Sequence, residues 1–136
     1  HYILNNKKVL ERKRTLKEFL GFNKVKGLQI RDLEKGVVQY MARNKANYKL
    51  YKCVVPTWDN TARKGNLGVI GYGSSPKLYY EWLKATLEDF KPYSEDENFI
   101  FINAMNEWAE GNHLEPCIKY GRAYLEATYN ALKDYV

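Results

Sequence analysis

The segment at residues 99–116 constrains this chain more than any other stretch of its sequence. It reads FIFINAMNEWAEGNHLEP and opens with four consecutive apolar residues at positions 99–102. The polar residues that follow are Asn103, Asn106, Glu107, Glu110, Asn112, His113 and Glu115. A buried strand that ends in amides and carboxylates is how many α/β enzymes present chemistry at the edge of a sheet. We therefore interpret residues 99–104 as a strand that carries a functional loop at its carboxyl end.

The rest of the chain alternates between helical and extended patterns. Apolar spacing predicts helices over residues 7–20, 31–43, 76–90 and 120–135, strands over 49–55 and 99–104, and a short extended segment at 67–72. Ser75 followed by Pro76 is a typical helix start. The alternation indicates an α/β fold, with parallel strands joined by crossover helices in a single domain over residues 1–136. Because such crossovers are right-handed, the loops after Val55 and Ala104 are expected on one rim.

The loop after the first predicted strand, TWDNTARKGN, carries the second set of candidate residues. Trp58 can stack on the C–H surface of a sugar or fill the core. Asp59, next to Asn60, can bind hydroxyls or accept backbone N–H groups in an Asx turn. Arg63 can hold an anionic group, although structural pairing with Asp59 or a glutamate is the more frequent role of an isolated arginine.

Glu107 and Glu110 form a candidate catalytic pair because they are three residues apart. If this segment turns helically, their side chains share one face, with Cβ atoms about 5–6 Å apart. Two carboxylates that close can divide the roles of base and acid, as they do in glycosidic-bond chemistry. The structural alternative is a pair of solvated carboxylates in a first helical turn capped by Asn106.

Three further residues of the segment have two open roles each. Trp108 can stack on a sugar or serve as core. His113 can donate a hydrogen bond to a sugar, and no metal site is predicted because no second ligand stands at a suitable spacing. Glu115 precedes Pro116 and is therefore expected to be extended. It can orient the loop or bind substrate.

Composition narrows the possible function classes. The chain has 136 residues, 45% of them hydrophobic, which suffices for one core. No apolar run approaches the roughly 18 residues that cross a membrane. Residues 1–52 hold 14 Lys and Arg against 4 Asp and Glu, whereas residues 53–136 hold 8 against 12. No phosphate loop or nucleic-acid-binding signature accompanies the basic half, so solvated helix faces are the preferred explanation and no nucleic-acid partner is predicted.

Two other features bear on the origin of the chain. Its two thiols, Cys53 and Cys117, predict neither a disulfide framework nor a metal motif, and they favour a cytoplasmic protein. The chain begins at His1 without a methionine, so we expect a piece of a longer protein.

Two motifs resemble those of a known family. INAMNEWAEGNHLEPCIKYGRAYLEAT, from residue 102 onward, is similar to the signature of the WbsX-type proteins, described as polysaccharide-biosynthesis glycosyltransferases and as glycoside hydrolase family 99-like. WDNTAR resembles a WDNTPR motif that such proteins carry upstream, and SSPKLYYEWL resembles the Pro-led helix between the two motifs. The resemblance covers about residues 48–136, and the motifs stand in the family's order.

The resemblance implies a (β/α)8 TIM-type barrel. A complete barrel needs about 250 residues, so this chain would be its C-terminal part. The resemblance also implies that Glu107 deprotonates the sugar 2-hydroxyl that attacks the anomeric carbon, and that Glu110 is the general acid and base at the glycosidic oxygen. The sequence departs from the family pattern at Ala62, Met105, Ala109 and Cys117, which leaves the sugar and the donor open.

Three functions are consistent with these features. The first is a carbohydrate-active enzyme that acts on a saccharide by hydrolysis or transfer, in bacterial polysaccharide or lipopolysaccharide metabolism, without a cofactor. The second is a glycosyltransferase that uses a nucleotide-sugar donor as a further partner. The third is a non-catalytic carbohydrate-binding or interaction module. The expected catalytic residues are Glu107 and Glu110, and the expected substrate-binding residues are Trp58, Asp59, Asn60, Arg63, Asn106, Trp108, His113 and Glu115.

Overall fold

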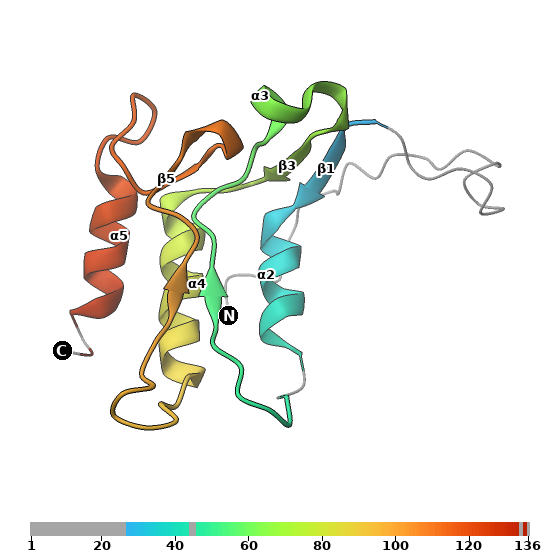
Figure 1. The fold of residues 1–136 in the computed structure, drawn as a ribbon. Coiled ribbons are helices and arrows are strands. Elements are labelled where there is room, and N and C mark those ends of the chain that lie inside the picture. Colours follow the sequence, from blue (N-terminus) through green and yellow to red (C-terminus); the bar gives the residue numbers. More distant parts are fainter. Residues whose placement is uncertain (1–26, 44–45, 134, 136) are drawn as a thin grey trace, which may run out of the picture.

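A computed structural model of the chain describes residues 27–43, 46–133 and 135. The helix predicted over residues 7–20 lies outside the described residues. The elements are, in order, β1 (Gln29–Asp32), α2 (Leu33–Met41), β2 (Cys53–Val54), α3 (Thr61–Lys64), η1 (Gly65–Leu67), β3 (Val69–Tyr72), α4 (Pro76–Asp89), β4 (Phe101–Ile102), β5 (Asn106–Glu107), η2 (Trp108–Glu110), β6 (Asn112–His113) and α5 (Ala123–Leu132). Figure 1 shows the resulting mixture of helices and short strands.

The strands form two parallel pairs and one hairpin. β2 pairs with β4 in parallel, with Val54 opposite Ile102. This pairing confirms the parallel relation predicted for the two strands around the third predicted helix. β1 and β3 also pair in parallel, whereas β5 and β6 form a short antiparallel hairpin after β4. These three pairs are separate two-stranded sheets within the described residues.

Several element boundaries differ from the predictions. The helix predicted over residues 31–43 begins at Leu33, because Arg31 and Asp32 belong to strand β1 and Asp32 caps the helix. Its Oδ1 accepts a hydrogen bond from the Lys35 backbone N–H at 3.0 Å. The last helix begins at Ala123 rather than at residue 120, because a turn that closes with Gly121 at φ +52° precedes it. The two predicted strands at 49–55 and 99–104 are each reduced to two paired residues.

Helix α4 organises the core. The Ser75 side chain accepts a hydrogen bond from the Leu78 N–H at 3.1 Å, and Pro76 occupies the first turn, as predicted. The buried residues of α4 follow helical spacing and are Tyr79, Trp82, Leu83 and Thr86. They pack with fully buried Val54 of β2 and with the buried face of α5, which consists of Tyr124, Ala127 and Ala131.

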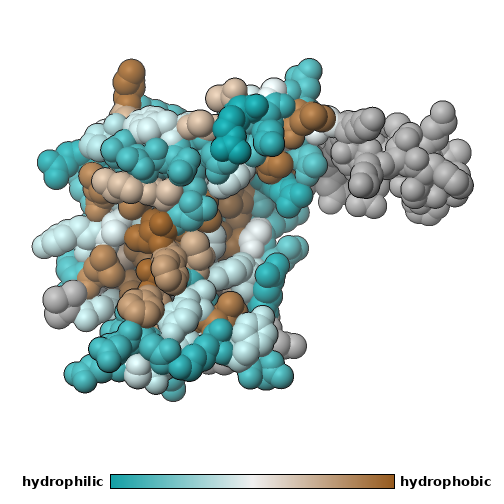
Figure 2. Space-filling view, viewed as in Figure 1, coloured by the Kyte–Doolittle hydropathy of each residue, from teal (hydrophilic) through white to brown (hydrophobic). Residues whose placement is uncertain are grey.

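The helices leave one side of β2 and β4 uncovered. Figure 1 shows the two strands lying over α4, with α2 and α5 to either side. The opposite side carries an apolar area in the middle of the face shown in Figure 2. Exposed apolar side chains of these strand segments include Leu50, Phe99 and Phe101, the last of which is 55% exposed. Apolar exposure beside the strands is what we expect if further strands of a larger sheet belong there.

Candidate functional site

The loops that follow β2 and β4 meet, as the parallel arrangement predicts. The Asp59 backbone N–H donates to the Glu110 carbonyl oxygen at 2.8 Å. Gly111 packs so closely that a Cβ atom there would lie 2.9 Å from the Asp59 carbonyl oxygen. The WDNTAR and NEWAEG motifs therefore form one surface at the carboxyl ends of β2 and β4.

The polar side chains of the first loop hold its own backbone. Asp59 Oδ1 accepts hydrogen bonds from the Thr61 N–H at 3.0 Å and the Thr61 hydroxyl at 2.6 Å. Asn60 Oδ1 accepts one from the Val69 N–H at 2.7 Å. Asp59 therefore forms an Asx turn, which is one of the two roles predicted for it. The backbone of the preceding residue, Trp58, is tied to β3, because its carbonyl oxygen accepts a hydrogen bond from the Gly71 N–H at 2.7 Å.

Arg63 joins the two loops through an ion pair. Its Nη1 lies 3.0 Å from Glu110 Oε1, and the Glu110 side chain is only 18% exposed. Pairing with Asp59 or a glutamate was the role favoured for Arg63 from the sequence. The observed partner is Glu110, one of the two candidate catalytic carboxylates. The contact immobilises Glu110 next to the first loop.

Glu107 stands in a different setting from Glu110. It lies in β5, pairs across the hairpin with Asn112 and is exposed. Glu110 follows in the single turn η2. The two carboxylates therefore share one 3₁₀ turn rather than the first turn of a longer helix, and the N-cap residue of that turn is Glu107 rather than Asn106. The helical condition attached to their spacing is met by this single turn alone, because the hairpin then sends the chain back at Asn112.

The hairpin also assembles a cluster of three polar and aromatic side chains. The Trp108 and His113 rings stack with centroids 3.8 Å apart and planes 17° apart. The Trp108 Nε1–H donates to Glu115 Oε2 at 2.6 Å, and His113 Nδ1 lies 3.2 Å from the Glu115 carbonyl oxygen. Trp108 nevertheless remains 49% exposed. Glu115 and His113 thus orient an accessible indole. Orienting the loop was one of the two roles left open for Glu115. The exposure of Trp108 shows that it is not a core residue.

A cavity of about 760 Å³ opens between the two loops. Its walls include four of the predicted residues, Trp58, Asp59, Trp108 and His113. The other six candidates, namely Asn60, Arg63, Asn106, Glu107, Glu110 and Glu115, belong to the same two loops but do not line this cavity.

The cavity also has walls that the sequence interpretation did not include. Ser74 and Tyr120 line it, and they are joined by a long hydrogen bond from the Tyr120 hydroxyl to the Ser74 carbonyl oxygen at 3.4 Å. Buried Tyr124 is a further wall, and burial raises the pKa of its hydroxyl. The sequence feature that could have indicated Ser74 as a wall residue was the extended segment predicted at residues 67–72. Treated as a third parallel strand, it would have placed the residues after it on the same rim.

The described residues contain neither a cluster of potential metal ligands nor a membrane-spanning helix. Residues 27–43, 46–133 and 135 contain no group of three or more His, Cys, Asp and Glu side chains placed to hold a metal ion. Within the same residues, no helix combines the length and apolar character needed to span a bilayer.

Replacing Gly111 by alanine should destabilise the junction between the two loops. Both Gly111 and Gly121 have φ near +50°, but only at Gly111 would the new Cβ meet backbone atoms. Gly121→Ala is therefore the control, and in both variants the left-handed backbone conformation should lower the free energy of unfolding by about 1–2 kcal/mol. Gly111→Ala should lose about 1–3 kcal/mol more from overpacking. Urea unfolding of both variants provides the measurement, and equal losses would show that the loops separate freely.

The sequence matches the family model described as Glycosyltransferase WbsX over residues 1–128. Similar curated proteins are two uncharacterized proteins named WxcX from strains of Xanthomonas campestris pv. campestris. They are 42% identical over 87 residues and 40% identical over 106 residues. These alignments cover 63% and 77% of this chain but only 12% and 15% of the relatives. No solved structure matches the chain.

Proposed function

Because the chain belongs to the WbsX glycosyltransferase family, we propose that it is part of a carbohydrate-active enzyme. The enzyme acts at a glycosidic bond in bacterial polysaccharide or lipopolysaccharide metabolism. One observation carries this proposal: the cavity at the carboxyl ends of the strands lies between Trp58 and Trp108, on the two loops that also supply Glu107 and Glu110. Aromatic faces suit a saccharide, because the rings take up its C–H surfaces. Asp59 brings a carboxylate to the cavity wall, and Glu107 and Glu110 flank Trp108 in the other loop.

In this proposal, the saccharide lies against Trp108. One face of the indole is occupied by His113, and its N–H is held by Glu115. The ring is therefore fixed before a ligand arrives, which reduces the conformational entropy lost on binding. Trp58 faces the cavity from the other loop, whose backbone is held by Asp59 and Asn60, and Asn106 and Arg63 complete the polar rim.

In the proposed reaction each carboxylate handles a different proton, Glu107 that of the sugar 2-hydroxyl and Glu110 that of the glycosidic oxygen. Glu107 takes the proton of the sugar 2-hydroxyl, whose oxygen then attacks the anomeric carbon. As the bond from that carbon to the glycosidic oxygen breaks, Glu110 gives a proton to the leaving oxygen. Water or an acceptor hydroxyl, deprotonated by Glu110, then opens the intermediate, and the proton on Glu107 returns to the 2-hydroxyl. Because Glu110 must carry a proton in the first step, its ion pair with Arg63 has to loosen when the saccharide binds.

The fold proposed for the complete enzyme is a (β/α)8 barrel, of which this chain supplies the C-terminal part. Supporting observations are the two parallel strand pairs and the exposed apolar side chains of Phe101 in β4 and of Phe99 just before it. A barrel of about 250 residues would supply the missing neighbours. The chain spans 12% to 15% of the length of its WxcX relatives, so the activity of the whole protein is part of the proposal.

Saccharide binding to this chain tests the proposal directly. Mannan-type oligosaccharides should bind, as measured by calorimetry, and Trp58→Ala or Trp108→Ala should weaken binding about tenfold, because stacking on an aromatic ring is lost. Tyr129→Ala is the matched control, since Tyr129 is an aromatic residue of α5 with 69% exposure that does not line the cavity. Unchanged binding in both tryptophan variants would contradict the assignment, as would a loss matched by Tyr129→Ala.

A non-catalytic carbohydrate-binding module is the second candidate. It is favoured by one specific observation, the ion pair that engages Glu110 with Arg63. Incubation of the complete protein with nucleotide-sugars and with mannan-type oligosaccharides separates the two functions. Product formation from either substrate supports the enzyme, and also tells transfer from hydrolysis. Binding without product supports the module.

A further inference from the structure

A second cavity, of about 980 Å³, opens at the other end of β2. It is formed by the end of α2, the segment that leads into β2 and the segment that follows α4. Its walls include Tyr40, Arg43, Tyr48, Lys49, Leu50, Lys52, Asp89, Phe90, Lys91 and Tyr93. We propose that this basic cavity binds a phosphate-bearing ligand with a planar body, which is the chemistry of a nucleoside phosphate.

The charges of the cavity walls favour an anion. Four cationic side chains line it against the single carboxylate of Asp89. Lys49 is neutralised by Glu97 at 2.7 Å, and Lys52 lies 3.6 Å from Asp89. Within the described part of the chain Arg43 and Lys91 form no ion pair, and both line the cavity. Phosphate oxygens suit them, because arginine and lysine bind phosphate through charge-assisted hydrogen bonds.

The rings of the cavity favour a planar body. Arg43 and Lys52 both approach the Tyr40 ring, with the Arg43 Cζ at 5.8 Å and the Lys52 Nζ at 5.4 Å from its centroid. Tyr48 is 67% exposed at the cavity, and Phe90 provides a further ring. Aromatic faces interleaved with cations are the combination that takes up a base together with its phosphates.

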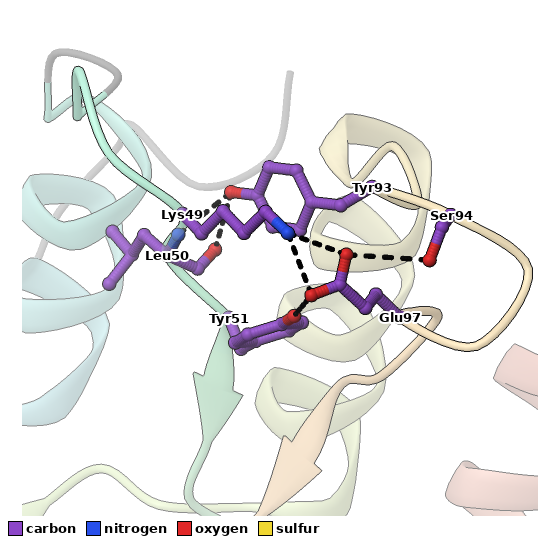
Figure 3. A network of polar contacts seen from close by, with 6 residues as sticks. All are labelled: Lys49, Leu50, Tyr51, Tyr93, Ser94 and Glu97. Carbon is purple, nitrogen blue, oxygen red and sulfur yellow. Dashed lines mark hydrogen bonds and ion pairs between the residues drawn. The ribbon is translucent and has the colours of Figure 1, made fainter.

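The wall beside β2 is held rigidly. Figure 3 shows the Tyr93 hydroxyl against the Leu50 backbone, where it accepts from the N–H at 2.8 Å and donates to the carbonyl oxygen at 3.2 Å. In the same network, Glu97 accepts hydrogen bonds from Lys49 and from the Tyr51 hydroxyl. These contacts fix the segment after α4 against the start of β2, so the cavity is preformed rather than created by a ligand.

The site is separate from the one proposed for saccharides. Its wall residues Lys49, Leu50 and Lys52 precede β2, whereas the WDNTAR loop follows it. Four residues, two of which form strand β2, lie between Lys52 and Thr57, and five residue steps span at most roughly 17 Å. A nucleotide held here would not lie at Glu107 and would act as a bound effector. The inference therefore goes beyond the proposed function and does not depend on it.

Calorimetric titration of the 136-residue chain tests the site, with UDP, UDP-glucose, pyrophosphate and uridine as probes. UDP and UDP-glucose should bind. Pyrophosphate and uridine should each bind at least tenfold more weakly, because pyrophosphate lacks the planar base and uridine lacks the phosphates. Tighter binding of UDP-glucose than of UDP would identify a nucleotide-sugar as the ligand, and equal binding a free nucleotide.

Variants decide whether the cavity is responsible. Arg43→Gln and Lys91→Gln should each weaken UDP binding about tenfold, since each removes a charged hydrogen-bond donor. Tyr48→Ala should weaken it by a similar factor through lost stacking. Lys64→Gln is the control, because Lys64 is an exposed cation of α3 outside the cavity. Absence of binding at millimolar UDP would overturn the proposal. So would equal losses in Arg43→Gln and Lys64→Gln, which would indicate non-specific attraction to a basic protein.

Discussion

Replacing Glu107 or Glu110 by glutamine should lower turnover of the complete protein by about 10²–10⁴-fold, the usual range for a general acid or base. Glutamine keeps the size and much of the hydrogen-bonding shape of glutamate but cannot exchange a proton. The two losses should be less than additive, because the carboxylates act in one reaction. Glu88→Gln is the control, since it removes an exposed carboxylate of α4 far along the chain from both motifs.

The nature of the leaving group separates the two roles. A substrate with an excellent leaving group needs no acid, so it should partly rescue Glu110→Gln. It should not rescue Glu107→Gln, which lacks the base. Full activity in either variant of the complete protein contradicts the proposed mechanism, whatever the substrate.

Stability distinguishes a catalytic Glu110 from a structural one. Its ion pair with Arg63 is partly exposed and should contribute only about 0–1 kcal/mol to the free energy of unfolding. Glu110→Gln and Arg63→Met should therefore unfold at similar urea concentrations. If Glu110 only tethers the loops, both variants should show the same modest loss of turnover. A loss confined to Glu110→Gln instead assigns the carboxylate to chemistry.

The sequence was most informative where local signals agree with the tertiary structure. Helix α4 begins at the predicted residue, Pro76 after the N-cap Ser75, because an N-cap side chain and a proline act on the nearest backbone groups. The parallel pairing of β2 with β4 could be inferred as well, since an intervening helix forces a crossover connection. That single inference placed the two motifs on one rim.

The site geometry was not accessible in the same way, because it depends on a turn that no periodicity reveals. Gly111 adopts a left-handed conformation and sends the chain back as β6, which brings His113 onto Trp108. The three-residue spacing of Glu107 and Glu110 fits the single turn η2 but does not indicate that this turn lies inside a hairpin. Strand β1 was missed for a related reason. Its four residues alternate little in burial, and only pairing with β3 defines it.

Raising the pH above 10 should destabilise the protein through Tyr79. This residue is 1% exposed, and burial raises the pKa of its hydroxyl to about 12 from an ordinary value of 10. The folded state therefore holds the proton more tightly than the unfolded chain does. The associated stability is complete below pH 10 and disappears as the pH rises through about 12. A shift of two pH units corresponds to roughly 2–3 kcal/mol.

Urea unfolding between pH 7 and pH 12 measures this loss, with Tyr79→Phe as the test and Tyr129→Phe as the exposed control. At pH 7, Tyr79→Phe should be less stable by about 0.5–1.5 kcal/mol, because it lacks the hydrogen bond to Thr128 Oγ1 at 3.0 Å. In that bond the Tyr79 hydroxyl is the donor, since Thr128 itself donates to the Tyr124 carbonyl oxygen. Above pH 10, the stability of Tyr79→Phe should fall less steeply than that of the unmodified protein, so the two curves should converge and cross. The Tyr129→Phe curve should stay parallel to that of the unmodified protein. Parallel curves for Tyr79→Phe as well would mean that Tyr79 does not set the alkaline limit.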